Sequence, residues 1–294
     1  MFRQYQVPLT PAIQGDMGEL TLPSGPVVRY YQGPLKQGRP LVLLHSVNAA
    51  PSAMEMKPLF DAFCAERAVI ALDLPGFGLS ERGPFAYSPQ LFAEAIDTCV
   101  RALCPESPDI VAFSLTAEFV ARALRDNATP CATFTAISPT GMGSREPPGP
   151  EVGDRIASFL RLPGLGVGLF RLLTTRLSIR YFLGQAFVGS VPKELTRYAW
   201  LSARQKDARF APFAFLSMGL FTPNALDTLY ASVSVPMQVF YDKDPNVNFD
   251  RIGELEALNP RVQSRRVGPS LGLPHWEQTE TVVAALRTFW RQAN

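Results

Sequence analysis

The sequence predicts an α/β protein, in which a mostly parallel sheet is flanked by helices and interrupted once by a helical cap. Over about the first 140 residues, short apolar runs alternate with helix-like stretches, as in parallel strands covered on both faces. Residues 142–232 contain helical patterns broken by glycine and proline, and strand–helix alternation then returns. We therefore expect a core in two parts, residues 1–141 and 233–294, with the cap at 142–232 inserted between the sixth and seventh strands.

The individual elements follow from these patterns. Before the cap, strands are expected at residues 20–22, 27–31, 41–45, 68–72, 109–113 and 132–137. The helices between them are expected at 54–67, 89–103 and 115–126. After the cap, strands are expected at 237–241 and 262–267, and helices at 251–258 and 279–291. Open α/β sheets bind ligands at the carboxyl ends of their strands, so we expect the cap to lie over a ligand site.

Composition limits the classes of partner and cofactor. A net charge of +2 gives no global reason to expect a nucleic-acid partner. The four cysteines form no CxxC pair, and with two histidines they make no standard zinc site. The segment 76–81 lacks the third glycine of a dinucleotide loop, so we expect neither a metal nor a cofactor. The chain starts without an apolar leader, and we expect a cytoplasmic location.

Ser114 is the strongest candidate for a catalytic residue. The strand-like run 109–113 leads directly into Ser114, and a helix-like run begins at Leu115. This is the layout of a nucleophile elbow, a sharp turn between a strand and a helix that exposes a serine hydroxyl. The layout predicts that Ser114 is a nucleophile at the carboxyl edge of the sheet.

Further motifs occur in a characteristic order. The run 43–46 ends in His45-Ser46, and residues 73–80 read Asp-x-x-Gly-x-Gly-x-Ser. Ser138 ends a strand, and Asp244 follows the strand expected at 237–241. With the elbow, these motifs resemble the α/β-hydrolase family with a helical cap, over residues 20–289. The resemblance implies a triad of Ser114, Asp244 and His275, in the family's chain order. It also implies an oxyanion hole formed by the backbone N–H groups of Val47 and Leu115.

The chain departs from the family pattern at four positions, one of which is Ser46, in place of a glycine in the oxyanion loop. Ala112 and Thr116 stand where the elbow usually has glycines, and the β-branched Thr116 is harder to fit into a tight turn. The family motif Gly-His-x-Pro-His-x-Glu is matched by residues 271–277, with Gly272 at the position of the base. His275 then matches the second histidine of that motif, which is usually structural. It acts as the base only if the loop follows a different route.

Three functions stay open at this point. The first is a cofactor-independent serine hydrolase acting on an apolar ester or acyl substrate. The second is a protein that has lost the base and binds a hydrophobic ligand or a protein partner. The third is a lyase-type enzyme on the same fold. The expected pocket residues are His45, Ser46, Phe113, Phe213 and Met218, although His45 also fits a buried turn residue and the cap residues also fit core packing.

The cap carries an unusual charge pattern. Residues 155–192 contain five arginines and no acidic residue. Leu169, Leu172, Leu173 and Leu177 fall on one helical face by spacing. One interpretation is a stripe that packs onto the core. The other is a lid that contacts a membrane surface peripherally, with its arginines at the level of the lipid headgroups.

Overall fold

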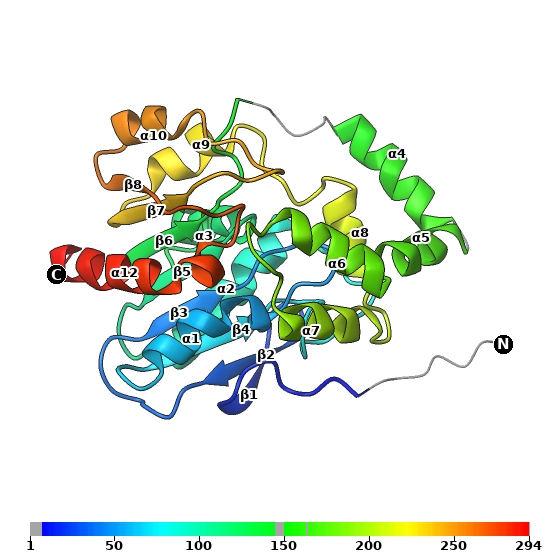
Figure 1. The fold of residues 1–294 in the computed structure, drawn as a ribbon, viewed down its shortest axis with the longest axis horizontal. Helices are drawn as coiled ribbons and strands as arrows, with labels where there is room; N and C mark the ends of the chain where they lie inside the picture. Colours follow the sequence, from blue (N-terminus) through cyan, green and yellow to red (C-terminus); the bar gives the residue numbers. More distant parts are fainter. Residues whose placement is uncertain (1–7, 145–149, 163, 294) are drawn as a thin grey trace.

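The computed structural model describes residues 8–144, 150–162 and 164–293, and an eight-stranded sheet forms the centre of the fold (Figure 1). Its strand order is β1-β2-β4-β3-β5-β6-β7-β8. β1 pairs antiparallel with β2, and β2 with β4, whereas all the other neighbours are parallel. The strands are β1 (Asp16–Thr21), β2 (Val27–Gln32), β3 (Leu41–Leu44), β4 (Val69–Asp73), β5 (Asp109–Phe113), β6 (Thr133–Ile137), β7 (Met237–Tyr241) and β8 (Val262–Arg266). The predicted fold class is confirmed.

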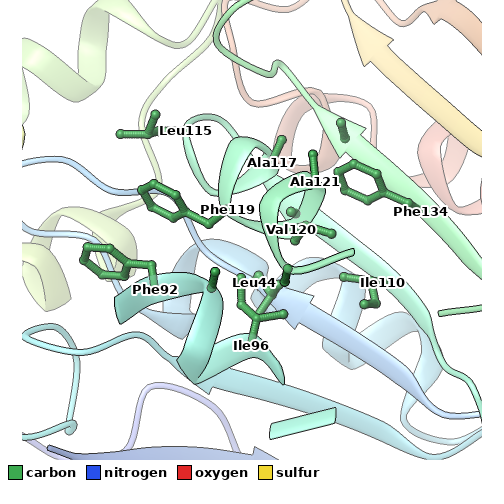
Figure 2. Packing of buried hydrophobic residues seen from close by; sticks show 14 of the residues in the cluster. Leu44, Phe92, Ile96, Ile110, Leu115, Ala117, Phe119, Val120, Ala121 and Phe134 are labelled. Atoms are coloured by element: carbon green, nitrogen blue, oxygen red, sulfur yellow. The ribbon is translucent and has the colours of Figure 1, made fainter. Parts of the chain in front are cut away.

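Helices cover both faces of this sheet. Along the central strands, alternate residues point to opposite sides, as the two-residue repeat of a strand requires. Leu44 and Ile110 pack with α2 (Pro89–Leu103) and α3 (Thr116–Asp126) on one face, which Figure 2 shows. Leu43 and Val111 belong to the core of the other face, with α1 (Lys57–Phe63) and α12 (Thr279–Ala293). The continuous apolar runs of the sequence therefore reflect burial on both sides.

The shorter elements refine the expected boundaries. The helix expected at 54–67 is a 3₁₀ turn, η1 (Ala53–Met56), followed by α1. After β7 the chain forms α10 (Ile252–Leu258), and the short α11 (Pro274–Glu277) precedes α12. The first strand begins at Asp16, earlier than the predicted residue 20, because its outer face is exposed and carries little apolar signal.

The helical insertion between β6 and β7 is also confirmed. Its helices are α4 (Pro150–Arg161), α5 (Leu165–Leu173), α6 (Arg176–Gln185), α7 (Lys193–Ala203) and α8 (Phe210–Leu216), followed by α9 (Ala225–Thr228) and η2 (Tyr230–Ser232). In Figure 1, α4 to α8 gather at one end of the molecule. Arg82, in the loop after β4, donates to the hydroxyl of Ser202 in α7 at 3.3 Å. The cap therefore contacts a loop at the carboxyl edge of the sheet.

Candidate active site

Ser114 lies at the turn between β5 and α3. Between Asp109 and Ala121, every residue except Ser114 is buried. Its φ angle is 56°, in the left-handed region that residues with a Cβ rarely adopt, and its N–H donates to the carbonyl of Ile137 in β6 at 2.8 Å. Such a conformation costs on the order of 1–3 kcal/mol and persists only where the surroundings hold it. The chain therefore keeps a strained, partly exposed serine at this edge of the sheet.

Thr116 fits the elbow through a hydrogen bond that the sequence did not reveal. The residue is fully buried, and its hydroxyl donates to the carbonyl of His45 at 2.6 Å. This bond joins the first residue of α3 to the loop after β3, so the larger side chain supports the turn. Glycine at this position would leave the carbonyl of His45 without that donor.

His45 is a buried turn residue. Its Nε2 accepts the N–H of Leu74 at 2.9 Å, so the proton lies on Nδ1, which is 2.6 Å from the carbonyl of Ser46. Burial lowers the pKa of His45 to about 3, and the ring is neutral at physiological pH. Both nitrogens are used in holding the loop, and the side chain is fully enclosed. Of the two interpretations of His45, this geometry fits the structural one.

Glu55 is a site residue that the sequence analysis missed. Its carboxylate accepts the N–H of Ser46 at 2.9 Å and the side-chain amide of Asn48 at 3.3 Å, and that amide also donates to the Ser46 hydroxyl at 2.8 Å. Burial raises the pKa of Glu55 to about 7. The spacing Ser52-x-x-Glu55 is typical of a helix capping box and could have drawn attention to it. In the structure, this carboxylate instead braces the expected oxyanion loop.

The oxyanion hole expected from the sequence consists of the backbone N–H groups of Val47 and Leu115. Within the part of the chain that is described, neither N–H has an acceptor. Leu115 directly follows the nucleophile candidate, and Val47 follows the loop residue braced by Glu55. Their role as oxyanion donors stays a prediction.

Asp244 lies directly beside Gly272. Its Oδ1 accepts the N–H groups of Asn246 at 2.7 Å and Val247 at 3.2 Å. Its Oδ2 is so close to Gly272 that a Cβ on that residue would lie 2.7 Å from the oxygen. Desolvation raises the pKa of the Asp244 carboxyl group. The structure therefore places the expected acid next to the glycine that occupies the base position in the sequence motif.

His275 has different partners from those of a catalytic base. It is fully buried in α11, its Nε2 is 2.9 Å from the carbonyl of Glu55, and the indole N–H of Trp276 donates to the same carbonyl at 2.7 Å. Its Nδ1 is buried and has no hydrogen-bond partner among the described residues. The ring packs edge-on against Phe113 at 5.0 Å between centroids. Burial lowers the pKa of His275 to about 4. Within the described structure, no hydrogen bond connects this imidazole to Ser114 or Asp244.

The cap and the loop after β4 enclose a cavity of about 670 Å³. Phe213 of α8 lines it, together with Tyr87 from the loop after β4 and residues of α4 and α5. The other four predicted pocket residues, His45, Ser46, Phe113 and Met218, are not among its lining residues. The cavity lies next to the carboxyl edge of the sheet, because its lining residue Tyr87 packs against Gly76 in the loop after β4. A Cβ on Gly76 would lie 2.8 Å from the Tyr87 ring.

Comparison with known proteins agrees with this architecture. A model described as the alpha/beta hydrolase family matches residues 41–285. The chain belongs to the α/β-hydrolase family. No curated protein matches the sequence significantly. Members of this family are mostly enzymes.

Solved structures with the same fold include three hydrolases from bacteria. A meta-cleavage product hydrolase from Pseudomonas fluorescens IP01 is 17% identical, with a TM-score of 0.71 and coverage of 94% of this chain and 98% of that one. An esterase from Thermogutta terrifontis is 18% identical, with a TM-score of 0.69 and coverage of 95% and 99%. An esterase from Exiguobacterium antarcticum is 13% identical, with a TM-score of 0.72 and coverage of 92% and 98%. At these identities, the similarity concerns the fold alone.

Proposed function

We propose that this α/β-hydrolase-fold protein binds an apolar acyl compound in its cap cavity and does not hydrolyse it through a Ser–His–Asp relay. The observation that carries the proposal is the open base position: Gly272 lies against the Oδ2 of Asp244, and the Nε2 of His275 is used by the carbonyl of Glu55. A serine hydroxyl is a weak nucleophile unless an adjacent base accepts its proton. Ser114 lacks such a partner among the described side chains.

The cap cavity supports an apolar ligand. Its volume of about 670 Å³ lies within the range of small-molecule sites. Most of the residues that line it are apolar, including Phe85, Tyr87, Leu160, Phe210 and Phe213, while polar atoms make up nearly half of its exposed surface. The polar groups nearby are already engaged, since the Tyr87 hydroxyl donates to the carbonyl of Gly83 and the Arg209 guanidinium pairs with Asp207. Such a lining favours an aliphatic or aromatic acyl group over a highly charged ligand.

Two measurements test this proposal together. A dansyl-labelled fatty acid should bind the protein, and filling the cavity by Ala157→Trp or Ala214→Trp should weaken binding at least tenfold. Ala284→Trp, at an exposed position on α12, is the matched control and should bind normally. A fluorophosphonate probe should label the wild-type chain no faster than Ser114→Ala. Fast labelling of the wild type that disappears in Ser114→Ala would show that Ser114 is activated, and this result refutes the proposal. Unchanged binding in both cavity variants refutes the ligand site.

A serine hydrolase acting on an apolar ester is the second candidate. It is favoured by the strained φ of 56° at Ser114 and by the unengaged N–H groups of Val47 and Leu115 in the described chain. In this mechanism, Ser114 attacks the acyl carbon, and His275 accepts its proton after the loop containing Gly272 has rearranged. Asp244 then stabilises the imidazolium. Hydrolysis of p-nitrophenyl butyrate that is lost in both Ser114→Ala and His275→Gln supports this candidate, and an inactive wild-type chain refutes it.

A further inference from the structure

The exposed apolar side chains of this protein are concentrated on the cap. Among the described residues, twelve large hydrophobic side chains are exposed, and nine of them lie between Val152 and Val188. Leu172 is 63% exposed, Leu177 80% and Tyr181 63%. Contiguous exposed apolar surface on a folded protein marks contact with another apolar phase or partner. The rest of the described surface shows no comparable concentration.

The predicted stripe of cap leucines divides into two parts. The helix ends after Leu173, where the Thr174 hydroxyl donates back to the carbonyl of Phe170 at 2.7 Å, and a second helix begins at Arg176. Leu169 and Leu173 line a groove between α4, α5 and α8. The other two members of the stripe, Leu172 and Leu177, face away from the protein. Core packing thus explains only half of the stripe.

Arginines accompany the exposed apolar residues. The exposed Arg171 is next to Leu172 on α5, and Arg180 is next to Tyr181 on α6. Arg176, at the start of α6, lies over the ring of Trp200 at 4.1 Å. No carboxylate within the described ranges pairs with these three arginines. We call the exposed side of α5 and α6, formed by Leu172, Leu177, Tyr181 and the three arginines, the cap ridge.

We propose that the cap ridge binds the surface of an anionic phospholipid bilayer. The apolar side chains would enter the boundary between headgroups and acyl chains, and the arginines would contact lipid phosphates. A second copy of this chain fits the ridge less well, because a symmetric contact would place arginines opposite arginines. The C-cap residue of α6, Ala186, lies beside Gly272, but the ridge is formed by exposed side chains that neither hypothesis uses at the site. The proposal is therefore independent of the function proposed for the site.

The geometry favours lying on the bilayer over crossing it. No single helix of the described chain is long and apolar enough to span a membrane, and α4 and α5 pass that test only as a pair bent by 96°. α5 alone has nine residues and extends about 13 Å, less than half of the roughly 30 Å hydrocarbon core. An amphipathic helix of this length can bury its exposed side in the headgroup region.

Vesicle sedimentation with the full chain tests the proposal. We expect binding to vesicles of phosphatidylcholine with 30% phosphatidylglycerol, and release at 0.5 M NaCl because surface charges are then screened. Binding to pure phosphatidylcholine should be at least tenfold weaker. The double variant Arg171→Gln/Arg180→Gln should weaken anionic-vesicle binding about 25-fold, at roughly fivefold for each arginine. Leu177→Ser/Tyr181→Ser should weaken it at least tenfold.

Matched controls distinguish binding through the cap ridge from nonspecific electrostatic or hydrophobic binding by the rest of the surface. Leu258→Ser and Arg265→Gln change an exposed leucine and an exposed arginine on α10 and β8, at the other end of the molecule in Figure 1. Both controls should bind vesicles like the wild type. The proposal is overturned if the wild type does not bind anionic vesicles, if the controls lose as much binding as the ridge variants, or if light scattering shows a dimer that Leu177→Ser dissociates. Circular dichroism and thermal melts establish that each variant is folded.

Discussion

The elbow at Ser114 and the loop from Gly268 to Glu277 retain their family geometry to different degrees. At the elbow, the substitution that looked most disruptive, Thr116, is accommodated by a hydrogen bond to His45, and Ser114 keeps its left-handed backbone. In the loop, the acid is near its expected neighbour, but that neighbour is Gly272 and the imidazole bonds to Glu55. The described chain therefore keeps a strained serine turn at the elbow, while the imidazole of the loop bonds to a carbonyl elsewhere.

Placing an imidazole at Gly272 tests this contrast most strongly. Gly272→His should increase the rate of fluorophosphonate labelling at Ser114 about 10³-fold, within the range that a positioned general base contributes. The φ of 127° at Gly272 and the close Oδ2 of Asp244 require the loop to adjust, so we also expect some loss of thermal stability. Mass spectrometry of the labelled peptide measures the gain.

Two controls make the result of this substitution decisive. Gly272→His combined with Ser114→Ala should show no labelling at position 114. Gly184→His adds an imidazole on the exposed end of α6, where a new Cβ meets no atom within 4 Å, and it should behave like the wild type. A folded Gly272→His chain that stays unlabelled contradicts the view that the elbow itself is competent.

The second test concerns the proton on His275. Its pKa is lowered to about 4 in the folded state, against 6.5 when unfolded, so the unfolded chain binds this proton first as the pH falls. His275 therefore contributes stability that is fully present above pH 6.5 and is lost as the pH falls to about 4. The difference corresponds to about 3 kcal/mol. The amide of His275→Gln can still donate to the carbonyl of Glu55. Between pH 6.5 and 4, the free energy of unfolding of this variant should fall by about 3 kcal/mol less than that of the wild type.

Urea unfolding at several pH values between 7 and 4 measures this difference. The pKa of Glu55 is raised to about 7, so its own contribution has the opposite sign and falls as the pH rises from 4.5 to 7. Comparing the wild type with His275→Gln removes that common contribution. Parallel stability curves for the two proteins contradict a buried, neutral His275.

The sequence predicted the fold more completely than the site, for identifiable reasons. Strand–helix alternation depends on local apolar patterns, and the buried strands such as 109–113 carry those patterns plainly. Gly272 was recognised by its place in a motif. The roles of Glu55 and Thr116 depend on hydrogen bonds to residues 9 and 71 positions away, which no local pattern specifies. The acceptor for His275 is a backbone carbonyl 220 positions away, and backbone acceptors leave no trace in a sequence.

The third test asks whether Thr116 supports the elbow as its contacts indicate. Thr116→Val keeps the shape of the side chain but removes the donor to the buried carbonyl of His45. An unsatisfied buried polar group costs on the order of 1–3 kcal/mol, and we expect a loss of about 2 kcal/mol in the free energy of unfolding. Thr116→Ser, which keeps the hydroxyl, should lose less than about half as much. Equal stability of the valine and serine variants would show that the hydrogen bond does not hold the turn.

The smallest expected effects come from two substitutions that change the conformational freedom of the backbone, one at the elbow and one in the loop. Ser114→Gly removes a Cβ from a residue at φ 56°, and relief of strain should exceed the entropy cost of glycine by roughly 0.5 kcal/mol. Gly272→Ala adds a Cβ at φ 127°, 2.7 Å from the carboxylate of Asp244, and should lower stability by about 1 kcal/mol. Urea unfolding at one pH compares the two. If Ser114→Gly raises the free energy of unfolding and Gly272→Ala lowers it, the elbow stores backbone strain and the loop does not. If Ser114→Gly instead lowers it, the serine side chain makes contacts that outweigh its strain.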